Sequence, residues 1–508
     1  MKLALKILRS RFFLGAVCIL LQLLQLFVLF LQLRDLLVPI TLAGEVFYFG
    51  LLLYLLNREE LPEFKLLWLI ILSLFPLVGA FLLVVVSGSG VSRRDYTRYA
   101  EALRALAPYR QENPGLERLA EECPQAHLQA NYLYRFGGMP CFYDTATTYY
   151  PLGEDFHRAL LEDLHRAEKY IFLQYFIVEE GIMWDSIHAV LREKAAQGVN
   201  VYMLYDDFGS LPTLPSRYYR QLQREGICCI PSNQFKPILS NIHNNRDHRK
   251  ITVIDGRIGY TGGVNLADEY INAVTKYGHW KDTAVRLEGP GVQNLAAMFV
   301  AHWNGQSKRP FVFDAPPEPI PAAEGRGCVI PFGDGPQPIY REPIGKHVYM
   351  NMIHGAEKYL YITTPYLICD HEMLSALALA ARKGVDVRLV TPHISDNETV
   401  FLMTRSNYRP LLEAGVKLYE YTPGFIHAKN FVCDDVLAVC GTINLDYRSL
   451  EHHFECGVWM YDTDCIGEMK RDFLQVLEVS QPVTAETATL RGVRRLVAEV
   501  LKVVSPLL

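Results

Sequence analysis

The chain has 508 residues, of which 50% are hydrophobic and 21% are charged, and its formal net charge is −5. This length is sufficient for two or three domains, each with a full core. A charge so close to neutral argues against broad electrostatic attraction to nucleic acid.

Three predominantly apolar segments open the chain, at residues 12–33, 36–56 and 66–86. Each has about the 20 residues that a membrane-spanning helix needs. No small-residue cleavage site follows the first segment, so we expect it to be retained rather than removed as a signal peptide. Pro39 and Glu45 weaken the second, for which a core or interfacial helix is the alternative. We predict a membrane anchor over residues 1–90 with two or three transmembrane helices.

Basic residues lie on both sides of this predicted anchor: Lys2, Lys6, Arg9, Arg11, Arg93, Arg94, Arg98 and Arg104. Three spans cannot place both groups in the cytoplasm, so these residues do not decide the orientation. Ten of the 11 cysteines lie from Cys123 onward, without a CxxC pair, which favours a reducing compartment. We predict a multi-pass protein of the cell membrane with its main domain on the cytoplasmic side.

After a predicted connector over residues 91–132, the sequence repeats one series of strand and helix patterns. The apolar stretches that follow Lys169 and Lys358 are both typical of buried strands. Helical stretches then end at Gly198 and Gly384, which act as C-caps before another strand. This alternation predicts an α/β fold with a mainly parallel sheet, present twice.

The repeat defines two lobes that we expect to be related by a pseudo-two-fold axis, over residues 133–308 and 344–508. Residues 309–343, between them, are rich in Pro and Gly and are predicted to form an extended linker.

Both lobes contain the same polar motif with identical spacing of His, Lys, Asp and Asn: His248, Lys250, Asp255 and Asn265, then His427, Lys429, Asp434 and Asn444. Residues two apart on a strand face the same side, so each His projects together with its Lys. The glycine-rich turn before each Asn lets the backbone approach a ligand closely. A single motif fits a structural His and a surface Lys equally well, but duplication in register argues against that interpretation. Two such units facing each other would surround a phosphodiester.

The first lobe has extra residues before its motif. Matching residues are 189 positions apart at Lys169 and Lys358 but 179 apart at the two motif histidines. The insertion falls within residues 231–247 and includes Phe235, Pro237, Ile238 and Leu239. We predict a loop beside the site that gates it or touches lipid, with a plain surface excursion as the alternative.

These motifs resemble those of the phospholipase D superfamily, whose signature is two HxKx4D motifs, each followed by Gly, then Ser or Thr, any residue and Asn. With its hydrophobic N-terminal segments and its length, the chain is similar to bacterial cardiolipin synthases from about residue 61 to the C-terminus. In this family an acidic residue after each motif orients a His, and the resemblance assigns that role to Asp282 and Glu455. The alternative for each is a solvated charge at a strand end. Gly263 departs from the signature, which Thr442 keeps, and we expect one weaker phosphate contact there.

The resemblance implies phosphatidyl transfer from one phosphatidylglycerol to another through a phosphohistidine, giving cardiolipin and glycerol. His248 is then the nucleophile and His427 the acid and base. The implied catalytic residues are His248, Lys250, Asp255, His427, Lys429 and Asp434, and the implied phosphate-binding residues are Asn265, Asn444, Gly263 and Thr442. Because the lysines supply positive charge, we expect neither a metal ion nor another cofactor. The expected partners are phosphatidylglycerol, other anionic phospholipids and the membrane, but not nucleic acid.

Several alternatives use the same residues. A membrane-bound phospholipase D would give the intermediate to water and release phosphatidic acid, and a related enzyme would transfer it to another alcohol. A nuclease is disfavoured by the apolar segments and by the lack of a basic patch. An inactive scaffold would be expected to have lost a motif His or Lys, and none is lost. Residues 484–508 suit either an amphipathic helix on an anionic leaflet or a helix packed on the second lobe.

Overall fold

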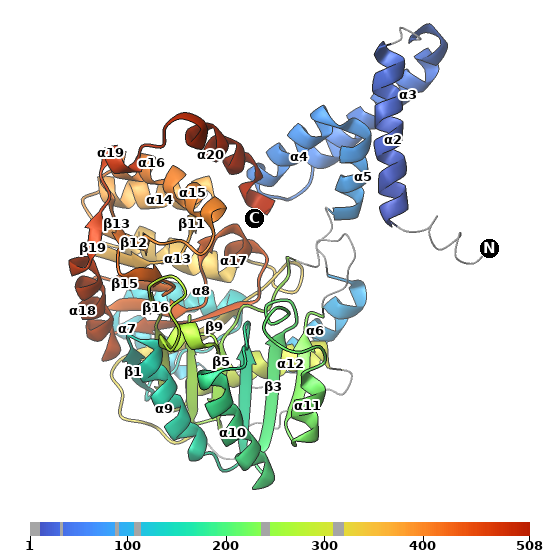
Figure 1. Ribbon diagram of the computed structural model, residues 1–508. Coiled ribbons are helices and arrows are strands. Elements are labelled where there is room, and N and C mark those ends of the chain that lie inside the picture. The colour runs from blue at the N-terminus through green and yellow to red at the C-terminus, as the bar shows by residue number, and fades with distance from the viewer. Residues whose placement is uncertain are drawn as a thin grey trace. The chain divides into compact units, whose positions relative to one another are not determined.

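The computed structural model describes residues 11–30, 34–86, 91–105, 113–234, 244–307 and 320–507. The chain divides into two compact units, which are described separately below (Figure 1). The first contains Met1–Gly90, Lys236–Asn244 and Lys502–Leu508, and the second contains Val91–Phe235 and Asn245–Leu501.

The first unit is helical, with α2 (Arg11–Phe30), α3 (Arg34–Leu56), α4 (Pro62–Leu74) and α5 (Pro76–Val86). The third predicted span, residues 66–86, is divided between α4 and α5 because Pro76 lacks an N–H and its ring clashes with a preceding helical turn. Within the described part of the chain, no helix combines the length and the apolar character needed to cross a membrane. The predicted transmembrane helices are therefore not supported.

The second unit contains two mixed sheets, and the prediction of an α/β fold with two sheet-containing lobes is confirmed. The first sheet has the order β1-β8-β6-β5-β2-β3-β4. Its strands are β1 (Ala146–Tyr150), β2 (Tyr170–Tyr175), β3 (Asn200–Asp206), β4 (Cys228–Ser232), β5 (Ile251–Ile254), β6 (Ile258–Gly262) and β8 (Ala284–Glu288).

The second sheet has the order β19-β13-β12-β10-β15-β16-β18-β9. Its strands are β9 (Cys328–Asp334), β10 (Tyr359–Thr363), β12 (Asp386–Pro392), β13 (Lys417–Tyr421), β15 (Asn430–Cys433), β16 (Leu437–Gly441), β18 (Glu455–Tyr461) and β19 (Ser480–Pro482). The parallel strands β2-β3-β4 correspond to β10-β12-β13, and the antiparallel strands β5-β6-β8 correspond to β15-β16-β18.

Each sheet is therefore mainly antiparallel, with parallel pairing only among β2, β3 and β4 and among β10, β12 and β13, whereas the sequence predicted a mainly parallel sheet. The difference lies in the motif strands, which are joined by tight turns instead of helices. Asp255 and Gly256 have φ of 53° and 71°, and Asp434 and Asp435 have φ of 54° and 65°. Positive φ at both central positions is the geometry of a tight hairpin between antiparallel strands.

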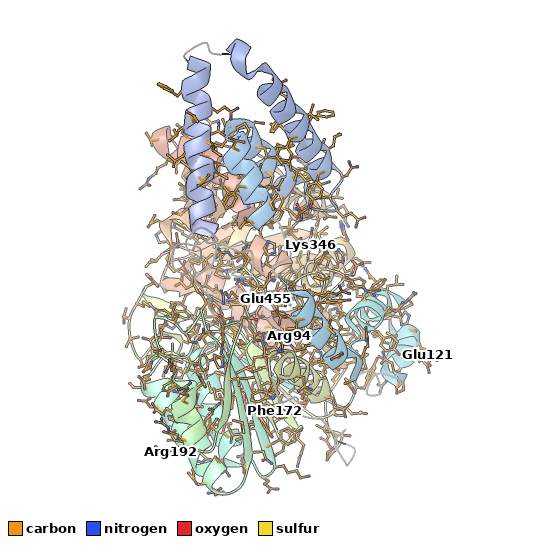
Figure 2. The ribbon with its side chains drawn as sticks, turned by 90° about the vertical axis from the view of Figure 1, so that its right-hand side faces the viewer. Arg94, Glu121, Phe172, Arg192, Lys346 and Glu455 are labelled. Carbon is orange, nitrogen blue, oxygen red and sulfur yellow. The ribbon has the colours of Figure 1, made fainter. Side chains whose placement is uncertain are left out.

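The helices that pack against the sheets are α9 (Gly153–His165), α10 (Ile182–Ala196), α11 (Tyr219–Arg224), α12 (Val292–Gln306), α13 (Ile344–Gly355), α14 (His371–Arg382), α16 (Tyr408–Glu413) and α18 (Cys465–Glu478). Four further helices are α15 (Glu398–Ser406), α17 (Tyr447–Glu451), α19 (Ala485–Ala488) and α20 (Gly492–Val504). Alternate residues of β2 enter different cores. Leu173 packs in the core that includes α9 and α10, while Phe172 packs against Phe299 of α12 in the core that the two sheets share. Figure 2 marks Phe172 on the first sheet and Glu455 on the second.

The remaining elements are short: α6 (Arg93–Ala105), α7 (Pro114–Glu122), α8 (Pro124–Tyr132), η2 (Leu133–Gly137), η4 (Asp268–Ile271), η5 (Ser505–Leu507), β7 (His279–Lys281), β11 (Leu367–Ile368), β14 (Gly424–Ile426) and β17 (Leu445–Asp446). The segment 309–343 is not linker throughout, because it contains β9, which pairs with β18 along seven residues. The apolar run of β9 is fully buried, and this burial outweighs the surrounding Pro and Gly.

Candidate active site

The two motif histidines lie at the starts of the hairpins, beside the carboxyl ends of β2 and β10. The Nδ1 atom of His248 lies 2.9 and 3.0 Å from the carboxylate oxygens of Glu455, and Nδ1 of His427 lies 2.6 Å from Oδ2 of Asp282. Each His is therefore paired with the carboxylate of the other lobe. Because the carboxylate accepts the Nδ1 proton, a neutral imidazole keeps the Nε2 lone pair for chemistry.

Backbone contacts between the lobes fix this crossed pairing. The N–H of His248 donates to the carbonyl of Phe454 at 2.9 Å, and the N–H of His427 donates to the carbonyl of Lys281 at 2.7 Å. Strand β7, just before Asp282, pairs with β14, just before His427. The same arrangement thus occurs twice with the lobes exchanged, and the site requires both lobes.

The motif lysines lie beside the histidines. Nζ of Lys250 donates to the carbonyl of His248 at 2.7 Å, and Nζ of Lys429 donates to the carbonyl of His427. Both side chains are buried, and among the ion pairs of the described residues none includes either lysine. Burial lowers the pKa of Lys250 to about 8. Burial and the charge of Lys250 lower the pKa of Lys429 to about 7, although Asp282 opposes this. Two cations therefore stand close together without a bound carboxylate.

The ionisation of the histidines follows from the same burial. Burial lowers the pKa of His248 to about 3, opposed by Glu455 and reinforced by Lys250. Burial and Lys429 lower the pKa of His427 to about 4, opposed by Asp282. Burial alone would raise the pKa of Asp282 and of Glu455, but the paired imidazoles lower both below their usual values. At neutral pH the site thus holds two neutral imidazoles against two ionised carboxylates.

A family model described as "Cardiolipin synthase, PLD-like domain" matches residues 160–303 and 349–477. The chain belongs to the cardiolipin synthase family with phospholipase-D-like domains. A protein of Geobacillus kaustophilus named cardiolipin synthase is 35% identical over 92% of this chain and 93% of its own. Cardiolipin synthase 2 of Bacillus cereus is 36% identical over 91% and 90%. The crystal structure of a phosphatidylserine synthase from Haemophilus influenzae, 14% identical, shares the fold with a TM-score of 0.57 over 75% of this chain and all of its own.

The residue after the motif glycine lies beside the carboxylate that binds a motif His, in both lobes of this member of the cardiolipin synthase family. The hydroxyl of Thr442 donates to Glu455 and accepts from the N–H of Cys456 at 3.0 Å. At Gly263, a Cβ atom would lie 2.0 Å from Oδ1 of Asp282. The hydroxyl of Thr442 is directed at Glu455, and phosphate binding by Thr442 and Gly263 stays a prediction. Gly263 provides the space that Asp282 occupies.

The motif aspartates bind backbone N–H groups at the ends of strands. The carboxylate of Asp255 accepts from the backbone N–H groups of Glu168, Lys169 and Tyr170 at 2.7–2.8 Å. Asp434 accepts in the same way from residues 357–359 of the second lobe. Both lie at the hairpin turns, separated from the motif lysines by the length of a four-residue strand. These backbone contacts are structural, and a catalytic role for Asp255 and Asp434 stays a prediction.

The asparagines differ between the lobes. Asn265 accepts from the N–H of Ile177 at 3.0 Å and donates to the hydroxyl of Tyr270 at 2.7 Å. Asn444 is 5% exposed, and its Oδ1 atom has no hydrogen-bond partner among the described residues. Both lie in the turns that follow the motif hairpins, but only Asn444 has a free buried oxygen.

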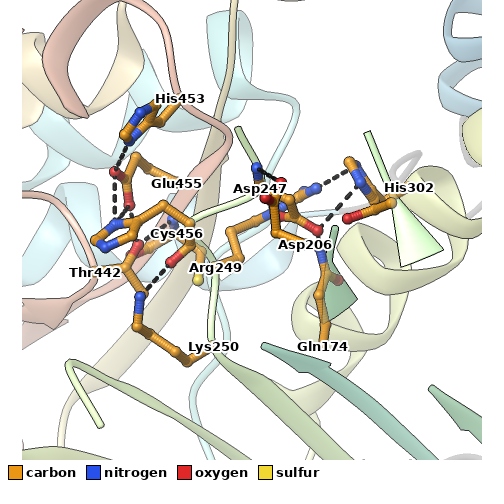
Figure 3. A network of polar contacts seen from close by, with 12 residues as sticks. Gln174, Asp206, Asp247, Arg249, Lys250, His302, Thr442, His453, Glu455 and Cys456 are labelled. Carbon is orange, nitrogen blue, oxygen red and sulfur yellow. Dashed lines mark hydrogen bonds and ion pairs between the residues drawn. The ribbon is translucent and has the colours of Figure 1, made fainter. Parts of the chain in front are cut away.

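A buried polar network flanks His248 and was not predicted from the sequence (Figure 3). The carboxylate of Asp247 lies 2.7 Å from Nε2 of Gln174, 3.0 Å from Nε of Arg249 and 3.1 Å from Nε2 of His302. Arg249 also donates to Nδ1 of His302, and Asp206 accepts from the N–H of Asp247 at 3.0 Å. The network fixes the residues on both sides of His248. In the sequence, only the polar residues Asp247 and Arg249 on either side of His248 indicated this network, since His302 is distant in sequence.

The two histidines have different surroundings. Aromatic rings enclose His427, with centroids of Tyr270, Trp280 and Phe425 at 5.5, 5.7 and 5.9 Å. The ring of Phe176 lies 5.1 Å from that of His248. On the His248 side, His248, His453 and Glu455 have potential metal-ligand atoms within 4.8 Å of one another. The lysines already supply the positive charge that a metal ion would add for phosphoryl chemistry.

Proposed function

We propose that this chain transfers the phosphatidyl group of one phosphatidylglycerol to another, giving cardiolipin and glycerol. The observation that carries the proposal is the composite site, in which each buried His is held by a carboxylate of the other lobe. Two buried lysines lie beside the histidines and form no ion pair with any described residue. Two cations and two imidazoles suit the single negative charge and the two exchangeable oxygens of a phosphodiester. Relatives named cardiolipin synthases cover more than nine-tenths of the chain.

In the first step, Nε2 of His248 attacks phosphorus, a P–N bond forms, and the P–O bond to the glycerol headgroup breaks. His427 donates its proton to the departing glycerol oxygen. His427 is neutral before substrate binds, but the anionic phosphodiester raises its pKa, so the proton is taken up on binding.

In the second step, neutral His427 accepts the proton of a headgroup hydroxyl on a second phosphatidylglycerol. That oxygen attacks phosphorus, the P–N bond breaks, and His248 regains its lone pair as cardiolipin forms. Lys250 and Lys429 offset the negative charge that collects on the non-bridging oxygens in both steps. The free Oδ1 of Asn444 is available to accept a hydrogen bond from a substrate hydroxyl.

The reaction takes place at the cell membrane in this proposal, because donor and acceptor are both bilayer lipids. All 11 cysteines are free, which supports a second unit that faces the cytoplasm. Cys228 is exposed, so a membrane-impermeant thiol reagent tests the side. We expect Cys228 to be labelled only after intact cells are broken, with Cys228→Ser as the control. Labelling in intact cells would place the unit outside.

The products decide the function. Purified protein is incubated with phosphatidylglycerol vesicles, and the lipids are resolved by mass, with His427→Ala as the inactive control. We expect one cardiolipin for each glycerol released. Phosphatidic acid with glycerol would instead show hydrolysis by a phospholipase D. Formation of a new phosphatidyl ester only when another alcohol is added would show a different acceptor.

A further inference from the structure

Helix α20 presents an apolar stripe to the exterior. Val493, Leu496, Val497 and Val500 are three or four residues apart and therefore share one face of the helix. Their side chains are 76%, 67%, 41% and 58% exposed. Ala498, about 140° around the helix axis from Val493, is 1% exposed. The buried side of the helix is thus away from the apolar stripe, which the described residues leave largely uncovered.

The charges of this segment are mainly positive. Residues 491–504 contain four basic side chains and one acidic side chain: Arg491, Arg494, Arg495, Lys502 and Glu499. Arg494 and Arg495 are exposed. A soluble surface rarely leaves such a contiguous apolar stripe uncovered, and an apolar face combined with a basic polar face is typical of a helix that lies in a membrane interface.

We infer that α20 binds the surface of an anionic phospholipid bilayer, with Val493, Leu496, Val497 and Val500 in the acyl region and the arginines at the lipid phosphates. The positive charge selects this occupant over a second copy of the chain, because a two-fold pairing of α20 would bring like charges together. The inference rests on the proposed function, which supplies anionic lipid as both substrate and product. Docking of α20 would hold the enzyme on the part of the membrane that contains its substrate.

Hydrogen exchange of the α20 amides tests the docking directly. The full chain is placed in nanodiscs of phosphatidylglycerol with phosphatidylcholine, or of phosphatidylcholine alone. We expect exchange over residues 492–501 to be at least about tenfold slower in the anionic discs, because a docked apolar face suppresses helix opening. Equal exchange in both discs would overturn the inference. Protection that instead rises with protein concentration would assign the stripe to a second copy.

Variants of the stripe separate docking from catalysis. Leu496→Ser with Val500→Ser is compared with Leu379→Ser, which replaces an apolar residue of α14 that is 52% exposed. We expect turnover of the double variant on phosphatidylglycerol vesicles to fall by about tenfold or more, because the two apolar side chains that the bilayer would bury are removed. Turnover of a dispersed short-chain phosphatidylglycerol should be unchanged, as should both activities of Leu379→Ser. Equal loss on both substrates would overturn the inference.

A charge variant and the exchange data keep the two proposals distinguishable. Arg494→Gln with Arg495→Gln should remove the difference between anionic and neutral discs and leave the melting temperature unchanged. If it leaves that difference intact, the arginines do not select the lipid and the inference fails. If the wild-type chain makes no cardiolipin from either substrate, the proposed function fails, while hydrogen exchange still decides whether α20 docks.

Discussion

The two halves of the site have the same backbone but different surroundings for the carboxylate. In one half, Glu455 contacts His248, the hydroxyl of Thr442 and, at 3.6 Å, Nδ1 of His453. In the other half, Asp282 contacts His427 at 2.6 Å and accepts from the N–H of Thr283 at 2.8 Å. Glu455, the longer acid, thus lies beside the hydroxyl of Thr442. Asp282, the shorter acid, lies beside Gly263, which has no side chain. The sequence difference between the lobes tunes the carboxylates, whereas the imidazoles and ammonium groups are the same.

This difference makes the histidines unequal. Glu455 contacts two imidazoles and one hydroxyl, while Asp282 contacts one imidazole among the described residues. The undivided contact of Asp282 with His427 suits the imidazolium that the proposed mechanism forms there. The geometry supports His248 as the neutral nucleophile and His427 as the group that gains and loses the proton.

The largest expected effect separates the two histidines. His248→Ala and His427→Ala should each reduce turnover by at least about 10⁴-fold, because each removes a group needed in both steps. With a substrate labelled at phosphorus whose leaving group needs no proton, such as a nitrophenyl phosphodiester, quenching in alkaline denaturant preserves a P–N bond and should recover labelled protein from His427→Ala but none from His248→Ala. Label on His248→Ala would reverse the assignment and make His427 the nucleophile.

Replacing either Asp282 or Glu455 by its amide should have the next largest effect on turnover. Asp282→Asn and Glu455→Gln keep the shape but present the wrong hydrogen-bonding group to Nδ1, so we expect about 10³- to 10⁴-fold loss of kcat. Asp282→Asn should be the more damaging, because that carboxylate stabilises the imidazolium. Steady-state kinetics on phosphatidylglycerol vesicles measures both variants. A larger loss in Glu455→Gln would contradict the inequality of the two halves.

The motif pairs could be predicted from the sequence because the backbone dictates them. A strand places residues two apart on one face, so His248 with Lys250 and His427 with Lys429 follow from spacing alone. The repeat of strands and helices was also readable, since each lobe has its own hydrophobic pattern. For the motif aspartates, spacing shows that the residue recurs, but not whether its carboxylate faces a ligand or the strand ends.

Other features depend on contacts between distant residues. The crossed pairing of His248 with Glu455 joins residues 207 positions apart, and no local pattern encodes it. His302 contributes to the network beside His248 only because α12 packs under β5. The role of β9 was hidden by the Pro and Gly around it. Residues 235–243, with the apolar loop positions Phe235, Pro237, Ile238 and Leu239, lie outside the described residues, so the gating loop stays a prediction.

Substitutions at the turn positions sharpen the comparison. Gly263→Ser should reduce kcat by about 100-fold or more, because its Cβ would displace the Asp282 carboxylate from His427. Thr442→Ala removes one hydrogen bond to Glu455, and we expect about tenfold loss. Melting temperatures within a few degrees of wild type would show that both act on the site. A greater loss in Thr442→Ala would mean that Asp282 tolerates a side chain at residue 263.

The lysines predict a pH dependence. Their pKa values of about 7 and 8 mean that the free site loses positive charge as pH rises through this range. An anionic substrate binds the charged form, so kcat/KM should fall across about pH 7 to 9, whereas kcat should fall less because the bound anion raises both pKa values. Lys429→Arg, whose charge persists, should move the decline to higher pH. A profile that is flat to about pH 9 would show that the lysines remain charged in the free enzyme.

The smallest expected effect concerns the only half with a cluster of potential metal ligands among the described residues. His248, His453 and Glu455 could hold an ion, whereas the Asp282 half encloses His427 in aromatic rings. Metal bound there would compete for the imidazole that attacks phosphorus. We therefore expect turnover to be unchanged by EDTA and to be slowed by excess Zn²⁺, with His453→Ala relieving the inhibition. If EDTA abolishes turnover and one metal restores it, the lysines do not supply the charge that the reaction needs, and the Glu455 half is a metal site.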